Sequence, residues 1–197
     1  MTLAQRLRRQ LLDGEGADEP LFRSDDVMLP DGGLVPAAVL IAVTDRPEPG
    51  ILLTLRNASL RKHAGQVAFP GGRIDPDDDG AVGAALREAE EEIGLQRHYV
   101  DLVGMGHPYR TGTGYMITPV IGVVPPDLRL SPHADEVEAI FEPPVRHLLD
   151  PANYVERAAE WNGRMRRYRE TFWNEYRIWG ATASILANLA HRLGSEP

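Results

Sequence analysis

The segment "ALREAEEEIGL" (Ala85–Leu95) places four glutamates within five consecutive positions of a sequence that otherwise has the pattern of a packed helix. Each helical residue advances about 100° around the axis, so Glu88, Glu91 and Glu92 share one face while Glu90 points elsewhere. Carboxylates held this close raise one another's pKa unless a cation neutralises them. The pattern therefore indicates either a solvated acidic helix face or a site for a hard divalent cation, Mg²⁺ or Mn²⁺.

The helix that carries these glutamates is expected to begin near Asp79 or Gly80 and to end at Gly94, because glycine commonly terminates helices. An apolar stripe lies beside the carboxylate face, so one side of the helix can be buried while the acids stand at the rim of a cleft. The stripe consists of Val82, Ala85, Leu86, Ala89 and Ile93.

Residues around the helix could complete such a site. Arg87 directly precedes Glu88 and could hydrogen-bond a carboxylate, which would fix the direction of that carboxylate. Upstream, Gly71 and Gly72 let the backbone come close to a ligand, and their carbonyl groups are suitable metal ligands. The two glycines are also consistent with an ordinary tight turn after a strand.

Strands and helices follow one another in the manner of a layered α/β (α+β) domain. Apolar runs predict strands at 34–43, 51–56, 100–104, 115–124 and 136–141, with a brief strand in "QVAFPGG". Patterning predicts helices at 3–12, 145–149 and 178–193, and Asn162-Gly163 between two alternating runs predicts a β-hairpin. We expect one domain with a lead-in at 1–33, a core at 34–150, and a hairpin and helix at 151–197 packed on the same domain.

The composition limits the functions open to this chain of 197 residues, whose 43% hydrophobic content suits one globular core. A net charge of -8 argues against nucleic acid as a partner. The absence of cysteine excludes disulfides, thiolate nucleophiles and cysteine-type zinc sites. The N-terminus "MTLAQRLRRQLL" has no continuous apolar run, so neither a signal peptide nor a membrane span is expected, and a cytoplasmic location is the default.

The carboxylate helix resembles the signature of the Nudix hydrolase family, which reads Gly, five residues, Glu, seven residues, then Arg-Glu-apolar-x-Glu-Glu-x-Gly-apolar. The second half is matched at every defined position, by Arg87, Glu88, Ala89, Glu91, Glu92, Gly94 and Leu95. The first half departs from the signature, because Gly72 lies one residue too far from Arg87 and the early Glu position falls on Asp79. We therefore assign no role to Asp75 or to residues 77–79.

A second motif lies directly upstream. The segment "LLTLRNASLRKHAGQVAFPGG" (Leu52–Gly72) resembles the additional motif of the coenzyme A pyrophosphatase subgroup of this family. It departs only at Asn57, where the subgroup usually has Ser or Ala. The residues in register are Leu52, Leu53, Thr54, Arg56, Arg61, Gly65, Phe69, Pro70, Gly71 and Gly72.

The resemblance implies a Nudix α/β/α sandwich with a mixed β-sheet, to which the terminal helices and the hairpin are additions. It implies metal-dependent hydrolysis of the diphosphate of coenzyme A, or of its derivatives, to 3′,5′-ADP and 4′-phosphopantetheine. The implied metal ligands are Glu88, Glu91, Glu92 and the carbonyl group of Gly71, and the implied cofactor is Mg²⁺ or Mn²⁺.

Several groups are candidates for the base and for substrate binding. Glu88 is a candidate base or water-orienting group held by Arg87, while Glu136 and Glu138 alternate along a predicted strand and offer another base on one face. The segment "RNASLRKH" (Arg56–His63) is a local basic loop in an acidic protein, and its arginines predict contacts to the anionic groups of the substrate. The predicted substrate-binding residues are Arg56, Arg61, Lys62 and Phe69.

Two alternatives stay open at this stage. The same fold could act on ADP-ribose, dinucleoside polyphosphates or damaged nucleotides, since Pro108 and Tyr109 lie near a region that marks substrates in other subgroups. A non-catalytic nucleotide-binding module is the other alternative, although the complete set of acids speaks against it. The closing helix could pack on its own domain or on a second subunit of a homodimer.

Overall fold

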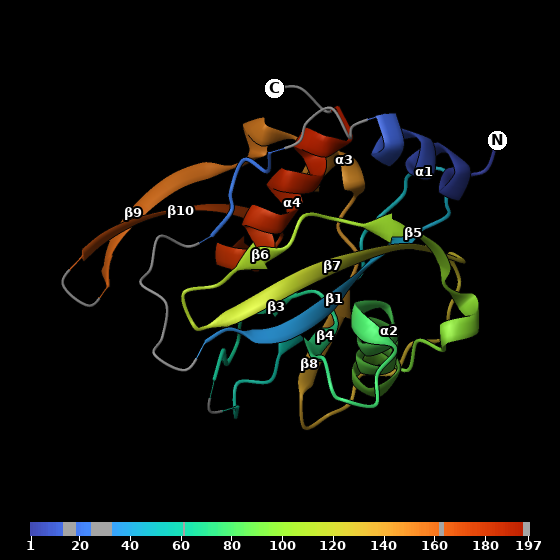
Figure 1. Cartoon of the computed structure of the whole chain (residues 1–197), viewed down its shortest axis with the longest axis horizontal. Helices are drawn as coiled ribbons and strands as arrows, with labels where there is room; N and C mark the ends of the chain where they lie inside the picture. Colours follow the sequence, from blue (N-terminus) through green and yellow to red (C-terminus); the bar gives the residue numbers. More distant parts are fainter. Residues whose placement is uncertain (14–18, 25–32, 61, 162–163, 195–197) are drawn as a thin grey trace.

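A mixed β-sheet forms the centre of the computed structural model, which describes residues 1–13, 19–24, 33–60, 62–161 and 164–194 (Figure 1). Its strand order is β4-β1-β7-β5, and β6 also pairs with β7. The central pair β1 and β7 is parallel, whereas β4, β5 and β6 join antiparallel to their neighbours. The strands are β1 (Val35–Thr44), β4 (Gly71–Arg73), β5 (Asp101–Met105), β6 (Tyr109–Arg110) and β7 (Tyr115–Val124).

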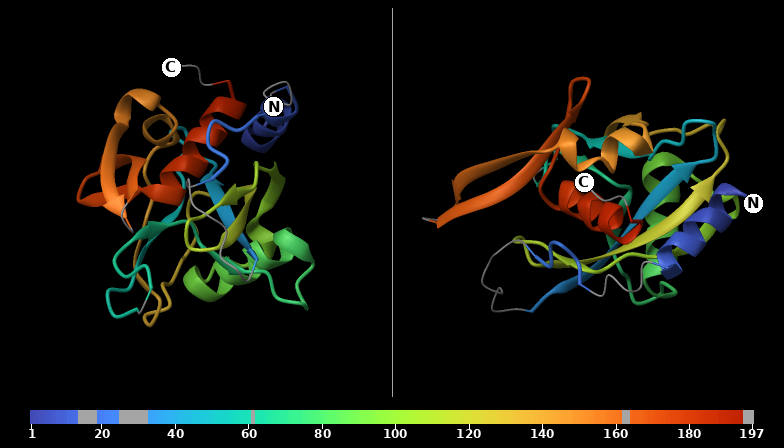
Figure 2. Two further views of the ribbon diagram at one scale, coloured as in Figure 1. Left: turned by 60° about the vertical axis from the view of Figure 1, so that its left-hand side comes forward. Right: turned by 90° about the horizontal axis from the view of Figure 1, so that it is seen from above.

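Two smaller antiparallel sheets flank the central one. The first has the order β3-β2-β8 and consists of β2 (Leu53–Arg56), β3 (Val67–Ala68) and β8 (Val137–Phe141). The second has the order β11-β10-β9 and consists of β9 (Val155–Trp161), β10 (Arg164–Trp173) and β11 (Tyr176–Trp179). The β9–β10 hairpin extends away from the body of the molecule (Figures 1 and 2).

Helices cover both faces of the central sheet. Helix α2 (Gly80–Ile93) packs on one face, while α1 (Leu3–Asp13) and α4 (Gly180–Arg192) lie on the other (Figure 1). The alternation of β1 explains this arrangement, because Leu40 belongs to the hydrophobic cluster under α2 and Ile41 to the cluster under α1 and α4. The remaining helical segments are α3 (Val145–Leu148) and two 3₁₀ turns, Arg97–Tyr99 and Pro151–Asn153. The predicted α/β/α sandwich is confirmed.

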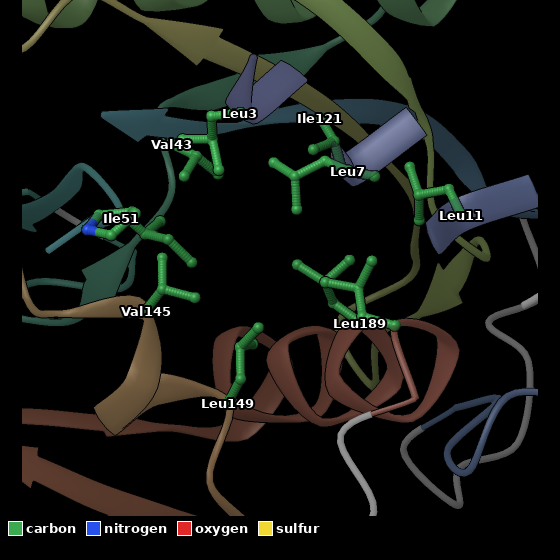
Figure 3. A pocket seen from close by; sticks show the side chains of 11 residues that line it. Leu3, Leu7, Leu11, Val43, Ile51, Ile121, Val145, Leu149 and Leu189 are labelled. Carbon is green, nitrogen blue, oxygen red and sulfur yellow. The ribbon is translucent and has the colours of Figure 1, made fainter. Parts of the chain in front are cut away.

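A small apolar cavity of about 60 Å³ lies in the core on the face opposite α2. Figure 3 shows aliphatic side chains of α1 and α4 facing each other across it. Its lining consists of Leu3, Leu7, Leu11, Val43, Pro49, Ile51, Ile121, Val145, Leu149, Leu189 and Leu193. The central sheet separates this cavity from the carboxylate helix, so the cavity is a feature of core packing.

The predicted boundaries of the carboxylate helix are confirmed. Helix α2 begins at Gly80, and Gly94 follows it in the left-handed conformation at φ 69°. The Gly94 N–H donates to the carbonyl of Glu90, and the Leu95 N–H donates to the carbonyl of Ala89. These bonds satisfy carbonyl groups at the helix end, which is the reason that glycine terminates it.

Other predicted elements need correction. The closing helix begins at Gly180 and not at 178, because Ile178 belongs to strand β11 and Gly180 turns the chain at φ 61°. The short strands β6 and β11 were absent from the sequence prediction, since neither has an apolar run of its own. Strands β9 and β10 pair antiparallel as predicted, while the predicted Asn162-Gly163 turn lies outside the described residues.

The closing helix α4 packs on its own chain. Ile185, Leu186 and Leu189 contribute to the same hydrophobic cluster as Leu3 and Ile41. These contacts place α4 in the core of this chain, and the homodimer stays a prediction. None of the helices within the described ranges has the length and apolar character needed to cross a membrane.

Candidate active site

Arg87 is the centre of a hydrogen-bond network at the carboxylate face of α2. Its Nε and Nη2 atoms donate to the two oxygens of Asp78, each at 2.9 Å. Its Nη1 atom donates to Glu88 and to Glu91, each at 3.0 Å. The bidentate bond to Asp78 fixes the guanidinium plane, and the hydrogen bond from Arg87 lowers the pKa of Asp78. Arg87 therefore orients two of the three predicted metal ligands.

Glu92 is a buried carboxylate with weak compensation. Only 3% of the residue is exposed. One carboxylate oxygen accepts from the Gly71 N–H at 3.2 Å, and the other lies 3.4 Å from Nη1 of Arg56. Burial raises the pKa of Glu92 to about 7, with smaller contributions from the charges of Glu88 and Glu136. A cation bound more closely than the Arg56 guanidinium would therefore stabilise the charged form of this carboxylate.

The Gly71-Gly72 turn brings the backbone of β4 against these acids. A Cβ atom at Gly72 would overlap the carboxylate of Glu88, and one at Gly71 would overlap the backbone of Ala38 and Val39 in β1. Gly71 therefore requires glycine, because the clash is with backbone, whereas at Gly72 the absence of a Cβ leaves room for the Glu88 carboxylate. Burial is the main cause of the raised pKa of Glu88, which Arg87 partly offsets.

The donor set fits a hard divalent cation by its chemistry. Carboxylate oxygens are the ligands that Mg²⁺ and Mn²⁺ prefer, and burial raises the pKa of both Glu88 and Glu92, a cost to their charged forms that a bound cation would offset. Within the part of the chain that the structure describes, no three Asp, Glu or His side chains already converge as a complete metal shell. Glu91, with its side chain 60% exposed, is turned toward Arg87 instead.

Comparison with known proteins identifies this arrangement. The model of the NUDIX domain matches residues 34–168, which is more than half of the chain. The chain belongs to the Nudix family. This confirms the family expected from the resemblance of the α2 segment.

Relatives with the same family name are similar over most of the chain. Proteins named "Uncharacterized Nudix hydrolase NudL" from Escherichia coli O7:K1 and from Cronobacter sakazakii are each 45% identical over 161 residues, which are 82% of this chain and 84% of the relative. A crystal structure of a Nudix hydrolase from M. smegmatis, RenU, has the same fold, with a TM-score of 0.50 and 23% identity over 58% of this chain and 73% of that chain. The protein is therefore an enzyme of the Nudix hydrolase class.

The two candidate bases at the start of β8 differ in their interaction with the carboxylates of α2. The charge of Glu136 contributes to the raised pKa of both Glu88 and Glu92. Glu136 directly precedes β8, and its carbonyl accepts from the Asn57 N–H at 2.8 Å. Glu138 lies within the strand, and both glutamates are exposed. Of the two candidates, Glu136 is therefore the one whose charge acts on Glu88 and Glu92.

Those predicted substrate-binding residues that the structure describes differ in their environments. Arg56 is directed at Glu92, Lys62 is exposed, and Arg61 lies outside the described residues. Phe69, expected to bind substrate, is only 3% exposed and belongs to the hydrophobic core. Phe69 lies between β3 and β4, so burial of its ring anchors the segment that leads to Pro70 and the two glycines.

Sequence reasoning missed Asp78. The Nudix signature places an acid at position 79 here. The residue that binds Arg87 is instead Asp78, whose side chain is only 6% exposed. The longer loop noted in the sequence thus shifts the acid by one position. The signal for this was the run of aspartates just before the helix, but its spacing alone does not select one of them.

Proposed function

We propose that this Nudix enzyme hydrolyses the diphosphate of coenzyme A, or of its derivatives, to 3′,5′-ADP and 4′-phosphopantetheine, with Mg²⁺ or Mn²⁺ as cofactor. The observation that supports this most strongly is the way in which the Leu52–Gly72 motif joins the carboxylate helix. Arg56 contacts Glu92, the Gly71 N–H binds Glu92, and Gly72 packs on Glu88. The motif that resembles the coenzyme A subgroup therefore directly contacts the carboxylates of the proposed active site.

The side chains of this site have separate tasks. Glu88, Glu91, Glu92 and the Gly71 carbonyl would hold the cation, which supplies charge neutralisation at the diphosphate and an acidified water. Arg87 holds Glu88 in place, and Asp78 holds Arg87. Arg56, Arg61 and Lys62 would contact the anionic groups of the substrate, since arginine binds phosphate in a bidentate manner.

Glu88 and Glu136 are the proposed acids for orienting or deprotonating the attacking water. Both belong to the same electrostatic cluster, and burial raises the pKa of Glu88 toward the range of a general base. Replacement of Glu136 by Gln should lower kcat, whereas the same change at Glu138 should leave it nearly unchanged. Equal effects of the two substitutions on the pH profile of kcat would contradict this assignment.

A substrate panel tests the function directly. The purified enzyme is incubated with Mg²⁺ or Mn²⁺ and, separately, with coenzyme A, ADP-ribose, diadenosine polyphosphates and dGTP analogues, and the products are identified by mass. Release of 3′,5′-ADP from coenzyme A compounds alone supports the proposal. Better turnover of ADP-ribose would move the substrate to the alternative class, and no turnover of any compound would favour a binding module.

Tyr109 gives little support to the alternative substrates. Its side chain is only 2% exposed and belongs to the core. A buried ring of this kind stabilises the sheet and does not present a surface to a nucleotide. We further propose a cytoplasmic location, and the homodimer stays a prediction.

A further inference from the structure

Arg73 and Tyr115 form a pair at the end of the central sheet, next to the carboxylate site. The Nη2 atom of Arg73 donates to the phenol oxygen of Tyr115 at 3.3 Å, and its guanidinium carbon lies 5.8 Å from the ring centroid. Arg73 belongs to β4 and Tyr115 to β7, and β1 lies between these strands (Figure 1). The two side chains therefore meet above the first residues of β1.

The pair is connected to the catalytic network through the backbone of β4. The carbonyl of Arg73 accepts from Nη2 of Arg87 at 3.1 Å. The preceding residue, Gly72, packs on the carboxylate of Glu88. Because successive side chains alternate across the edge strand β4, the carboxylate of Glu88 lies against one face of this strand at Gly72, and the side chain of Arg73 lies on the other face.

The charge of Arg73 is available to an anion. Its hydrogen-bond partner is a neutral phenol, and none of the ion pairs among the described residues includes Arg73. The side chain of Arg87, in contrast, is already directed at carboxylates. An exposed guanidinium beside an aromatic ring is suited to a ligand that combines a phosphate with a planar base.

We propose that Arg73 and Tyr115 bind the nucleoside half of the substrate, with Tyr115 stacking on the purine and Arg73 binding the phosphate on the ribose. This inference rests on the proposed function, because the proposed substrate, coenzyme A, carries a 3′-phosphate on its ribose in addition to the diphosphate. Recognition of the ribose phosphate is thus assigned to Arg73 in β4, whereas the basic loop around Arg56 would contact the diphosphate.

Calorimetric binding of 3′,5′-ADP and of 5′-AMP to the metal-free protein tests the proposal without relying on turnover. The two ligands differ only in the 3′-phosphate. Arg73→Gln should weaken 3′,5′-ADP binding at least about tenfold and 5′-AMP binding much less, since a charge-assisted bond to one phosphate is lost. Arg73→Lys should restore part of the preference. The matched control is Arg97→Gln, an exposed arginine on a 3₁₀ turn, which should change neither affinity.

The two tyrosine variants separate stacking from hydrogen bonding. Tyr115→Leu should weaken both nucleotides to a similar degree, whereas Tyr115→Phe should retain most of the affinity because the ring remains. Unchanged melting temperatures show that the variants are folded. An equal loss of both nucleotides in Arg73→Gln, an unaltered preference, or no binding of 3′,5′-ADP by the unmodified protein would each overturn the proposal.

The outcome is distinguishable from a failure of the proposed function. If the unmodified enzyme hydrolyses coenzyme A but Arg73→Gln leaves the nucleotide preference intact, only the subsite is wrong. If the enzyme cleaves no coenzyme A compound, the proposed function is wrong whatever the nucleotide affinities are. The ratio of kcat/KM for coenzyme A to that for its dephospho form gives a second readout, which should fall in Arg73→Gln through KM.

Discussion

Two buried glutamates in this protein face arginines, yet their environments shift the pKa of the carboxyl group in opposite directions. Glu92 in α2 is 3% exposed and Glu170 in β10 is 5% exposed. Glu170 accepts from Nε of Arg157 at 2.8 Å and from Nε of Arg177 at 2.7 Å, and these bonds lower its pKa. Glu92 has one distant guanidinium and one backbone N–H, and burial raises its pKa to about 7.

The difference separates structural from functional burial of charge. A carboxylate with two well-oriented guanidinium partners is compensated within the fold, so Glu170 fastens β9 and β11 to β10. A carboxylate buried beside other carboxylates is not compensated, so Glu92 costs stability until a cation arrives. We therefore interpret the buried carboxylate in α2 as a functional group and not as a stabilising one.

Glu92→Gln should give the largest effect on activity. Loss of one cation ligand removes several kcal/mol of charge stabilisation, which corresponds to roughly 10³-fold in kcat/KM. Folding should be retained, because a neutral isostere suits the buried position. The control is Glu90→Gln on the exposed side of the helix, which should keep near-normal kinetics. Substantial metal-dependent activity in Glu92→Gln would show that the carboxylate face has been misassigned.

Glu170→Gln should have the converse effect. The loss of two charge-assisted bonds should lower the free energy of unfolding by about 2 kcal/mol, measured by denaturant titration, while kcat stays close to normal. The control is Glu156→Gln, whose partner Arg167 has its side chain 82% exposed. This surface pair should contribute less than about 1 kcal/mol. A strong loss of activity in Glu170→Gln would remove the distinction between the two glutamates.

Asp78→Asn sharpens the comparison from the side of Arg87. Without the carboxylate, Arg87 loses its bidentate partner and should orient Glu88 and Glu91 less well, which should lower kcat about tenfold. The neighbouring change Asp79→Asn is the matched control, since Asp79 makes no side-chain capping bond to the helix. A larger loss of kcat in Asp79→Asn than in Asp78→Asn would show that Asp79, the position of the early acid in the Nudix signature, is the functional acid.

The pH dependence of stability should differ in sign between the two glutamates. In metal-free protein, the raised pKa of Glu92 means that the folded state binds more protons than the unfolded state between pH 4.5 and about 7. Its contribution to stability therefore falls as pH rises through that window, and Glu92→Gln removes this slope. The lowered pKa of Glu170 gives stabilisation that is present above its ordinary pKa and is lost as pH falls through its folded value.

Urea titrations of both Gln variants across this pH range provide the measurement. The advantage of Glu92→Gln over the unmodified protein should grow with pH, and the deficit of Glu170→Gln should disappear in strong acid. Addition of Mg²⁺ should abolish the first effect and leave the second. Parallel profiles for the two variants would contradict the comparison.

The local sequence determined much of the fold and of the site. The helical period alone placed Glu88, Glu91 and Glu92 on one face, and Gly94 marked the end of α2, because both depend only on neighbours along the chain. Apolar runs located β1 and β7 for the same reason. The glycine pair Gly71-Gly72 also indicated a backbone that can come close to a ligand beside the acids.

Only the tertiary structure decided which distant groups meet these elements. Arg73 and Tyr115 are separated by 42 positions and are joined by the pairing of β4 and β7 with β1, and the burial of Phe69 follows from core packing. The choice of Asp78 depends on the path of a loop, and the opposite pKa shifts of Glu92 and Glu170 depend on how many guanidinium groups reach each one. Periodicity encodes the direction of a side chain on its own element, whereas strand register and burial determine its partners.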